Sequence, residues 1–461
     1  MRILLDQAVY DQRNKGNVAL LQAAVARLGE LWPDASIYVL TEAPRLLRVY
    51  CPAVHPVGVH PWQNWSQGGR LRKAIHTAVP APVLRLLLES REEIWHRFPS
   101  LAAGGWRRRL GLGLARTRAN QGGERATTAP PPDLPVGDGD AREQSEDFLA
   151  AIHNADLVIA TGGGYLCDAD KEHSLQVYDT LATAIRLGKP AAMVGQGVGP
   201  LNDPELRARL KTILPFLDLI LVREPKIARP LLASLGVAPE RVIATGDDAI
   251  EMAFKERPLG WGRHIGVNLR LARYTEVDRG YIEKTRLALQ RAARRHDAPL
   301  MGLPTSCNIK EADLEVVRQV LRGYDRVTLD WRRFQPPLHL IREIGRCRVV
   351  VTGAFHPAVF ALAQGIPVVA LFKSAYAYDK FDALRDDFGS GCQLIHLDGE
   401  DFGETLVAAI DRAWESAEQV RPKLLEAAVR LVESARMGYR LLHDLYEARL
   451  AEPQLASRSA T

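Results

Sequence analysis

The chain has 461 residues, of which 47% are hydrophobic and 25% charged, with a formal net charge of +5. These values exclude a fibrous or wholly disordered protein, and the small net charge excludes a polycation built for nucleic acid. Because hydrophobic cores rarely grow beyond about 250 to 300 residues, the length predicts two domains. The five cysteines form no CxxC pair, so we expect reduced thiols and no metal site.

The N-terminal part of the chain predicts a β-α-β beginning. An apolar strand over residues 1–10 is followed by a helix over 17–33 and a strand over 35–41. Apolar residues recur in that helix at a spacing that places one face on a sheet. We find no signal peptide and no apolar run of about 18 residues, so we expect a cytoplasmic protein without a spanning helix.

Residues 61–145 interrupt this pattern. Trp- and Arg-rich helical pieces come first, and the stretch TTAPPPDLPVGDGD that follows predicts a flexible loop. The basic helices have two interpretations. They form either a solvated insertion beside the first domain or an amphipathic surface that lies on the anionic inner face of a membrane.

After the insertion, apolar strands that end in Gly or a polar residue again alternate with helices, as in parallel sheets buried on both faces. The predicted fold class is α/β, with two Rossmann-like domains over residues 1–257 and 258–400. Open sheets of this kind bind ligands at the carboxyl ends of their strands, so we expect a cleft between the domains. Residues 401–450 predict helices that brace both domains, and 451–461 predict a flexible tail.

Several glycine-rich turns and strand-end arginines are candidates for an anion site. Gly162, Gly163 and Gly164 follow a strand, where they either bring backbone amides close to an anion or simply allow a tight turn. The sequence contains neither the dinucleotide fingerprint GxGxxG at this turn nor a Walker motif. Further candidates at glycine-rich or strand-end positions are Gln196, Arg223 and Arg270.

A second group of candidates lies in residues 349–381. His356 follows a strand and opens a helix, where the positive end of the helix dipole favours the neutral imidazole that can accept a proton. A lone His is usually structural. Here the next strand is followed by Lys373, Tyr376, Tyr378 and Lys380, so we favour a catalytic or anion-binding role for His356.

Read in order, several motifs resemble the polysaccharide pyruvyl transferase family. Its signatures are NxGD, ADLVIxGGG followed by Asp, GKPxxxxGQGxGP, RxxxSxxxLxxLGV followed by DPA, and RxHxxxFAxxxGxPVV before a Tyr/Asp/Lys segment. This chain has NKGN, ADLVIATGGGYLCD, GKPAAMVGQGVGP, REPKIARPLLASLGV with TGDDA, and GAFHPAVFALAQGIPVV followed by YAYDKF. The resemblance covers nearly the whole chain apart from the insertion and the tail.

This resemblance implies a fold like that of GT-B glycosyltransferases and transfer of pyruvate from phosphoenolpyruvate to a sugar or lipid-linked oligosaccharide as a ketal. By motif position it makes His356, Lys380 and Arg223 the catalytic residues, with His356 as general acid or base. Arg270 and Lys373 are weaker candidates for binding the donor anion. No cofactor or metal is implied, and Asn17, at the end of NKGN, joins the substrate-binding residues.

The chain departs from the family motifs at Asn17, Ile227, Asp248 and Ala354, which stand for Asp, Ser, Pro and Arg. These changes keep two other hypotheses open. One is a GT-B-like glycosyltransferase that uses a nucleotide sugar, although ALFKSAYAYDKF is basic and aromatic where such enzymes carry an acidic residue for the ribose. The other is a non-catalytic glycan-assembly module, against which the presence of His356 with Lys380 argues.

Overall fold

The structure is a computed structural model, and it describes residues 1–59, 80, 82–86, 88–89, 146–308, 311, 313–330 and 332–458. The basic insertion predicted over 61–145 lies largely outside these residues. The same is true of the predicted loop within it and of the predicted contact with a membrane. Among the described residues, no helix has both the length and the apolar character needed to cross a bilayer.

The first domain is built on a parallel sheet of eight strands in the order β3-β2-β1-β4-β6-β7-β8, with β5 beside β6. Its central strands are fully buried, as expected for a sheet covered on both faces. The strands are β1 (Arg2–Asp6), β2 (Ser36–Thr41), β3 (His55–Gly58), β4 (Leu157–Ala160), β5 (Gly163–Leu166), β6 (Ala191–Val198), β7 (Leu219–Val222) and β8 (Val242–Ala244).

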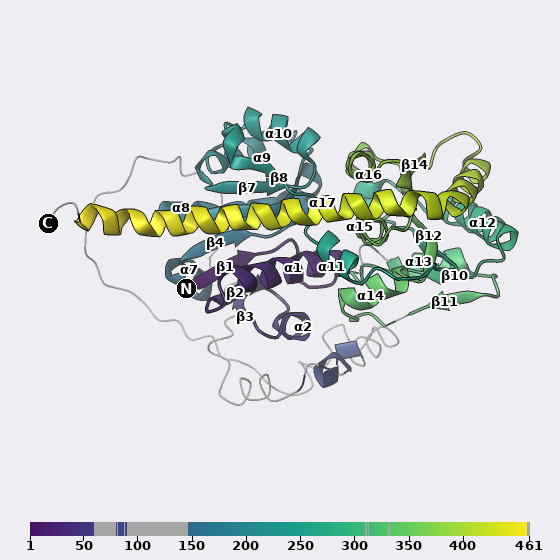
Figure 1. The fold of residues 1–461 in the computed structure, drawn as a ribbon, viewed down its shortest axis with the longest axis horizontal. Coiled ribbons are helices and arrows are strands. Elements are labelled where there is room, and N and C mark those ends of the chain that lie inside the picture. The colour runs from purple at the N-terminus through teal and green to yellow at the C-terminus, as the bar shows by residue number, and fades with distance from the viewer. Residues whose placement is uncertain are drawn as a thin grey trace, which may run out of the picture.

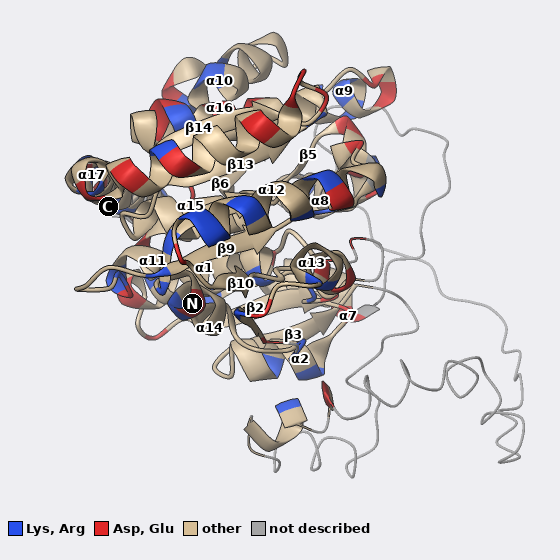
Figure 2. Ribbon diagram, turned by 90° about the vertical axis from the view of Figure 1, so that its right-hand side faces the viewer, with Lys and Arg blue, Asp and Glu red and all other residues tan. Residues whose placement is uncertain are grey.

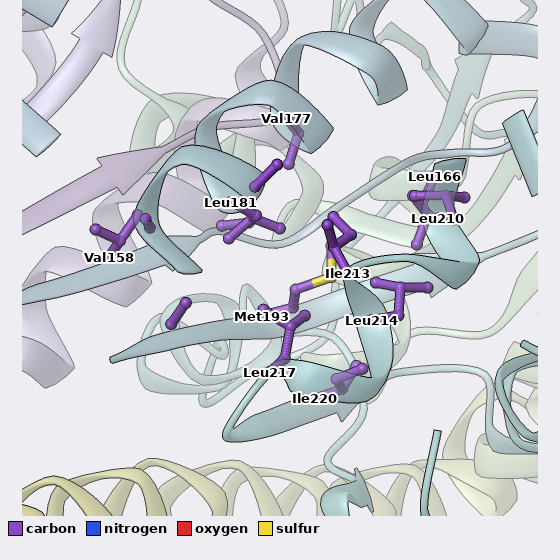
Figure 3. Packing of buried hydrophobic residues seen from close by; sticks show 14 of the residues in the cluster. Val158, Leu166, Val177, Leu181, Met193, Leu210, Ile213, Leu214, Leu217 and Ile220 are labelled. Carbon is purple, nitrogen blue, oxygen red and sulfur yellow. The ribbon is translucent and has the colours of Figure 1, made fainter. Parts of the chain in front are cut away.

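Helices cover both faces of this sheet (Figure 1). In Figure 3, buried side chains from β4, β6, β7 and two of these helices form one apolar cluster, with Met193 near its middle. The helices are α1 (Lys15–Leu31), α2 (Pro44–Tyr50), α7 (Glu146–Asn154), α8 (Lys171–Arg186), α9 (Pro204–Lys211), α10 (Pro225–Ser234) and α11 (Ile250–Lys255). Charged residues lie mainly on the helices, with few on the strands (Figure 2).

The second domain is a parallel sheet of six strands in the order β11-β10-β9-β12-β13-β14. Its strands are β9 (His264–Asn268), β10 (Leu300–Gly302), β11 (Val327–Leu329), β12 (Cys347–Thr352), β13 (Val368–Phe372) and β14 (Cys392–His396). Its helices are α12 (Gly280–Arg295), α13 (Asp313–Leu321), α14 (Pro337–Ile344), α15 (Phe355–Ala363) and α16 (Ala375–Phe388). The strand order reverses between β1 and β4 in one sheet and between β9 and β12 in the other, which confirms two Rossmann-like domains.

The two domains share a hydrophobic core. Ala19 and Leu20 of α1 and Ile250 of α11 pack in one cluster with apolar residues of α14 and α15. Backbone contacts also cross the boundary, because Asn14 and Ser306 form an antiparallel bridge and the N–H of Lys15 donates to the carbonyl of Thr305 at 3.0 Å. The first turn of α1 is thereby fixed against the second domain.

One helix, α17 (Phe402–Arg458), spans both domains over 57 residues (Figure 1). Its first part packs on the second sheet through Leu406 and Ile410, and its later part packs on the first sheet through Tyr439 and Leu442. The brace predicted over 401–450 is thus a single helix. It continues into the segment for which we predicted a flexible tail, because an established helix gains one hydrogen bond for each residue added.

Candidate active site

A cavity of about 350 Å³ lies between the two domains. Its walls come from the carboxyl ends of strands in both sheets and from the first turns of α1, α15 and α16. This is the crevice in which open α/β sheets bind ligands, and its volume is typical of a small-molecule site. Six of the predicted site residues line it: Asn17, Gly164, Arg223, Arg270, His356 and Lys380.

Arg223 follows β7 and is 3% exposed. Its Nε donates to Glu224 at 2.6 Å, its Nη1 donates to Asp247 at 3.2 Å, and its guanidinium lies 4.5 Å from the centre of the Phe355 ring. A Cβ on Gly197 would lie 2.5 Å from Nη2, so glycine is required there for the guanidinium to fit. Two carboxylates therefore orient Arg223 through its Nε and Nη1.

Lys380 lies on α16, and its ammonium donates a hydrogen bond to the Tyr376 hydroxyl. Tyr376 in turn donates to the carbonyl of Gly164 at 2.8 Å, which joins α16 of the second domain to the glycine turn of the first. A Cβ on Gly164 would lie 2.6 Å from the Lys380 Nζ and 2.9 Å from the Arg223 Nη2. Burial is the main cause that lowers the pKa of Lys380 to about 8, and the positive charge of Arg223 is the second.

His356 lies in the first turn of α15, and its ring packs directly against Gly16 in the first turn of α1. Its Nε2 is buried, has no hydrogen-bond partner among the described residues, and lies 3.9 Å from Asp247 Oδ2. Burial lowers the pKa of His356 well below its ordinary value, and Arg223, Arg270 and Lys380 lower it further. The imidazole is therefore neutral at physiological pH and can accept a proton at Nε2.

Arg270 follows β9 and lines the cavity, but its guanidinium is largely occupied. Its Nε and Nη2 donate to both oxygens of Asp313 at 2.9 Å and 2.8 Å, and Nη1 donates to the Tyr274 hydroxyl at 3.1 Å. This bidentate pair ties β9 to the start of α13. Arg270 therefore contributes positive charge near His356, while most of its donors already have partners in the protein.

Three of the other predicted residues lie behind the cavity wall. Gly162 and Gly163 allow close packing, since added Cβ atoms would lie 2.9 Å from the Gly195 carbonyl oxygen and 2.6 Å from the Ala8 side chain. Gln196 is fully buried, and its Nε2 donates to the Thr161 carbonyl at 2.6 Å. These residues shape the strand ends, and none of the three lines the cavity.

Lys373 and Tyr378 also lie away from the cavity. Lys373 donates to the Tyr281 hydroxyl at 3.0 Å and lies 3.5 Å from Asp398. Tyr378 is 37% exposed and packs on Phe372, with 5.2 Å between ring centres. Tyr378 lies away from the cavity because of the helical phase of α16, which directs positions 376, 377, 380 and 381 into the cavity and position 378 away from it. Lys373 precedes this helix.

Sequence reasoning missed several residues of the cavity: Asp11, Asn14, Asp170, Tyr274, Asn308 and Glu311. Tyr376, which the sequence placed in the group beside His356, does line the cavity, because it lies four residues before Lys380 on a helix that starts after Ser374. Asn14 caps α1, where its side chain accepts a hydrogen bond from the N–H of Gly16 at 3.0 Å. The others lie on loops that no local pattern brings together.

Two departures from the family motifs also line the cavity. Asn17 is in the first turn of α1, and Ala354 precedes α15, where the motif has Arg. The departure at Asp248 has a clear structural reason, because its carboxylate is fully buried and pairs with Arg27 at 2.5 Å. In the described part of the chain, no three His, Cys, Asp or Glu side chains are grouped to hold a metal ion.

Solved structures share this architecture at low sequence identity. A candidate UDP-N-acetylglucosamine 2-epimerase from Listeria monocytogenes has a TM-score of 0.56 and 13% identity, covering 96% of this chain and 95% of that one. The UDP-GlcNAc 2-epimerase from Neisseria meningitidis has a TM-score of 0.53 and 9% identity, covering 96% and 99%. The calicheamicin glycosyltransferase CalG4 has a TM-score of 0.50 and 13% identity, covering 98% of both chains. The fold is therefore GT-B-like.

Comparison with families gives a more specific result. No curated protein matches the chain. The model of the family described as polysaccharide pyruvyl transferase matches residues 14–371, which include β4 and β6 of the first sheet, β9 and β12 of the second, and every residue named above as catalytic by resemblance except Lys380. This match extends over well more than half of the chain. The protein therefore belongs to the polysaccharide pyruvyl transferase family, and it is a transferase.

Proposed function

We propose that this protein transfers pyruvate from phosphoenolpyruvate to a sugar of a cell-surface or exopolysaccharide precursor and forms a pyruvate ketal. Membership of the family supports pyruvyl transfer. The observation that carries the proposal is the buried Nε2 of His356, which has no hydrogen-bond partner in the described part of the chain and lies in one cavity with Lys380 and Arg223. A neutral base beside two cations suits a reaction between a small anion and a hydroxyl group.

The donor end of the cavity suits the phosphate and carboxylate of phosphoenolpyruvate. The Lys380 ammonium and the Arg223 Nη2 both lie against Gly164, where a single anionic group can contact both. The first turns of α1 and α15 meet at the same place, and helix N-termini attract anions. We assign Lys380 and Arg223 to the donor, with Arg270 contributing positive charge from the cavity wall.

The chemistry requires two hydroxyl groups of the sugar and proton transfer at each stage. In the first stage Nε2 of His356 takes the proton of one hydroxyl as its oxygen bonds to C2 of phosphoenolpyruvate, and the methylene carbon gains a proton to become methyl. In the second stage the C2–O bond to phosphate breaks, and the second hydroxyl bonds to C2 and loses its proton. The two protons lost by the sugar balance one gained by carbon and one that leaves with phosphate.

The rest of the cavity wall suits a hydroxyl-rich acceptor. Asp11, Asn14, Asn308 and Glu311 bring carboxylate and amide groups to it from both domains. Asn308 donates to Asp11 at 3.2 Å and Asn14 donates to Glu311 at 3.4 Å, so these groups are held in place across the domain boundary. Such groups both donate to and accept from sugar hydroxyls.

The test is phosphate release from phosphoenolpyruvate by the purified protein against a panel of free and lipid-linked sugars. We expect release that depends on the acceptor, disappears in His356→Ala and persists in Lys373→Ala, because Lys373 lies outside the cavity. No release with any acceptor, together with no calorimetric binding of phosphoenolpyruvate, contradicts the proposal. Turnover of a nucleotide sugar instead would favour the other hypothesis, a GT-B-like glycosyltransferase.

A further inference from the structure

Asp247 lies between the two groups to which the proposed function gives the chemistry. It follows β8 and is 4% exposed. Its Oδ1 accepts a hydrogen bond from the N–H of Ala249 at 2.9 Å, which fixes the carboxylate at the start of α11. Its Oδ2 is 3.2 Å from Nη1 of Arg223 and 3.9 Å from Nε2 of His356. One carboxylate oxygen therefore faces both the guanidinium and the imidazole.

The other charged groups near His356 are cations. Arg223, Arg270 and Lys380 all oppose a positive charge on the imidazole. Among the described residues, Asp247 is the only carboxylate within ion-pair distance of His356. When Nε2 takes a proton, the new positive charge forms in a buried place where charges interact strongly, and of the residues that the structure describes only Asp247 is positioned to stabilise it.

We propose that Asp247 is a positioning residue that stabilises the imidazolium of His356 during proton transfer while it holds Arg223 in the orientation needed for the donor. This inference rests on the proposed function, since it assumes that His356 receives a proton from the acceptor. The buried carboxylate of Asp247 thus acts on both His356 and Arg223. It also explains how a histidine surrounded by cations can act as a base.

The test compares Asp247→Asn with Glu224→Gln. Asparagine keeps an oxygen that can accept from the Ala249 N–H and loses the negative charge. Glu224 is the matched control, because it also binds Arg223, at 2.6 Å, but has no ion-pair contact with His356 among the described residues. Both changes disturb the support of Arg223, and only the first removes the carboxylate facing Nε2.

For Asp247→Asn we expect kcat to fall at least about tenfold, in the range that general-base catalysis contributes. We also expect the acid limb of the kcat profile to move to lower pH, because a nearby negative charge favours the protonated imidazole and its loss lowers the pKa of His356. For Glu224→Gln we expect a higher KM for phosphoenolpyruvate with the acid limb unmoved. Asp247→Asn with an unchanged kcat and an unmoved limb overturns the inference.

A second measurement separates this inference from the proposed function. NMR of the imidazole in the wild-type protein and in Asp247→Asn, without substrates, reports the pKa of His356 directly. We expect a lower pKa in the variant, and an equal pKa in both proteins overturns the role of Asp247 even if no acceptor supports turnover. Absence of phosphate release from the wild type, with the expected difference in pKa, contradicts the proposed function alone. Thermal unfolding of both variants shows whether they are folded.

Discussion

Asp247 and Asp248 are neighbours in the chain, yet they belong to two different ion networks. Asp247 faces the cavity, with Arg223 and His356. Asp248 faces α1 and α17, where it pairs with Arg27 at 2.5 Å and accepts from the Tyr439 hydroxyl at 2.9 Å. Both carboxylates are buried, so burial alone does not distinguish a functional charge from a structural one.

The difference lies in how completely each network is paired. On the side of α17, Arg27 contacts both Asp248 and Glu251, and Glu251 also contacts Arg436. On the cavity side, within the described residues, the Nε2 of His356 has no hydrogen-bond partner and the ammonium of Lys380 has no carboxylate in ion-pair distance. Unmatched polar groups in a buried site are costly unless something binds them, so the incomplete network marks the site.

The largest expected effect comes from the cavity network. His356→Gln should lower kcat for phosphate release by about 10²- to 10⁴-fold, because it removes the proposed base. Stability should change far less, since Nε2 makes no hydrogen bond among the described residues. Steady-state kinetics and urea unfolding measure the two effects. A kcat within about tenfold of wild type would assign the proton transfer to another group.

The network beside α17 should respond in the opposite way. Arg27→Met leaves Asp248 buried with no cation in contact, and breaking a buried pair from one side costs about 3–5 kcal/mol of stability. Urea unfolding measures the loss. The kcat of the protein that remains folded should be close to wild type. Arg286→Met is the control, because Arg286 pairs with Glu283 at the surface, where ion pairs contribute little.

Gly164→Ala tests the contact between the two cations and the glycine turn. The new Cβ would displace the Lys380 ammonium and the Arg223 Nη2, so the KM for phosphoenolpyruvate should rise about tenfold or more. Gly29→Ala is the matched control in α1, where an added Cβ has nothing within 4 Å. It should raise stability by about 0.5–1 kcal/mol and leave KM unchanged. An unchanged KM in Gly164→Ala would place the donor elsewhere in the cavity.

The pH dependence of donor binding tests Lys380. Its pKa is lowered to about 8, so the ammonium is charged below this pH and loses its proton above it. Affinity for phosphoenolpyruvate should therefore be full at pH 7 and fall as pH rises through about 8. Calorimetry at pH 7 and pH 9 measures the difference. Lys380→Met should bind weakly at both values, and a wild-type affinity that does not change between them would show that Lys380 does not hold the donor.

The smallest effects are expected outside the cavity. Lys373→Ala and Tyr378→Phe should each change kcat/KM by less than about twofold, because surface changes away from a site rarely exceed about 0.5 kcal/mol. Lys373 contacts Tyr281 and Asp398, and Tyr378 packs on Phe372. A large loss in either variant would mean that substrates extend beyond the cavity and past α16.

The fold was predictable because its strands are short apolar runs that end in Gly or a polar residue. The same rule identified Arg223, which directly follows β7, and Arg270, which lies two residues after β9. It could not separate Lys373 from Lys380, since that depends on where α16 begins. Ser374 fixes this start, because its side chain caps the helix by accepting from the N–H of Ala377 at 3.2 Å. From there the spacing of Tyr376 and Lys380 follows.

The role of Asp247 could not be predicted from local patterns. Its carboxylate contacts Arg223, which follows β7, and His356, which lies at the start of α15. His356 is more than a hundred residues away from Asp247 in the chain. Nor could the sequence explain Asp248, which stands where the family motif has Pro. Its partners, Arg27 and Tyr439, come from opposite ends of the chain. Long-range pairs of charges are set by the packing of elements, and one sequence contains no direct sign of them.

The path of α17 has a consequence for how the protein is made. Its 57 residues correspond to about 85 Å of helix, enough to return from the second domain to the first. Tyr439, Leu442 and Tyr446 complete the core of the first domain, although they are synthesised after the entire second domain. The first domain therefore leaves the ribosome with part of its core exposed, and it must await the last helix or be shielded until that helix arrives.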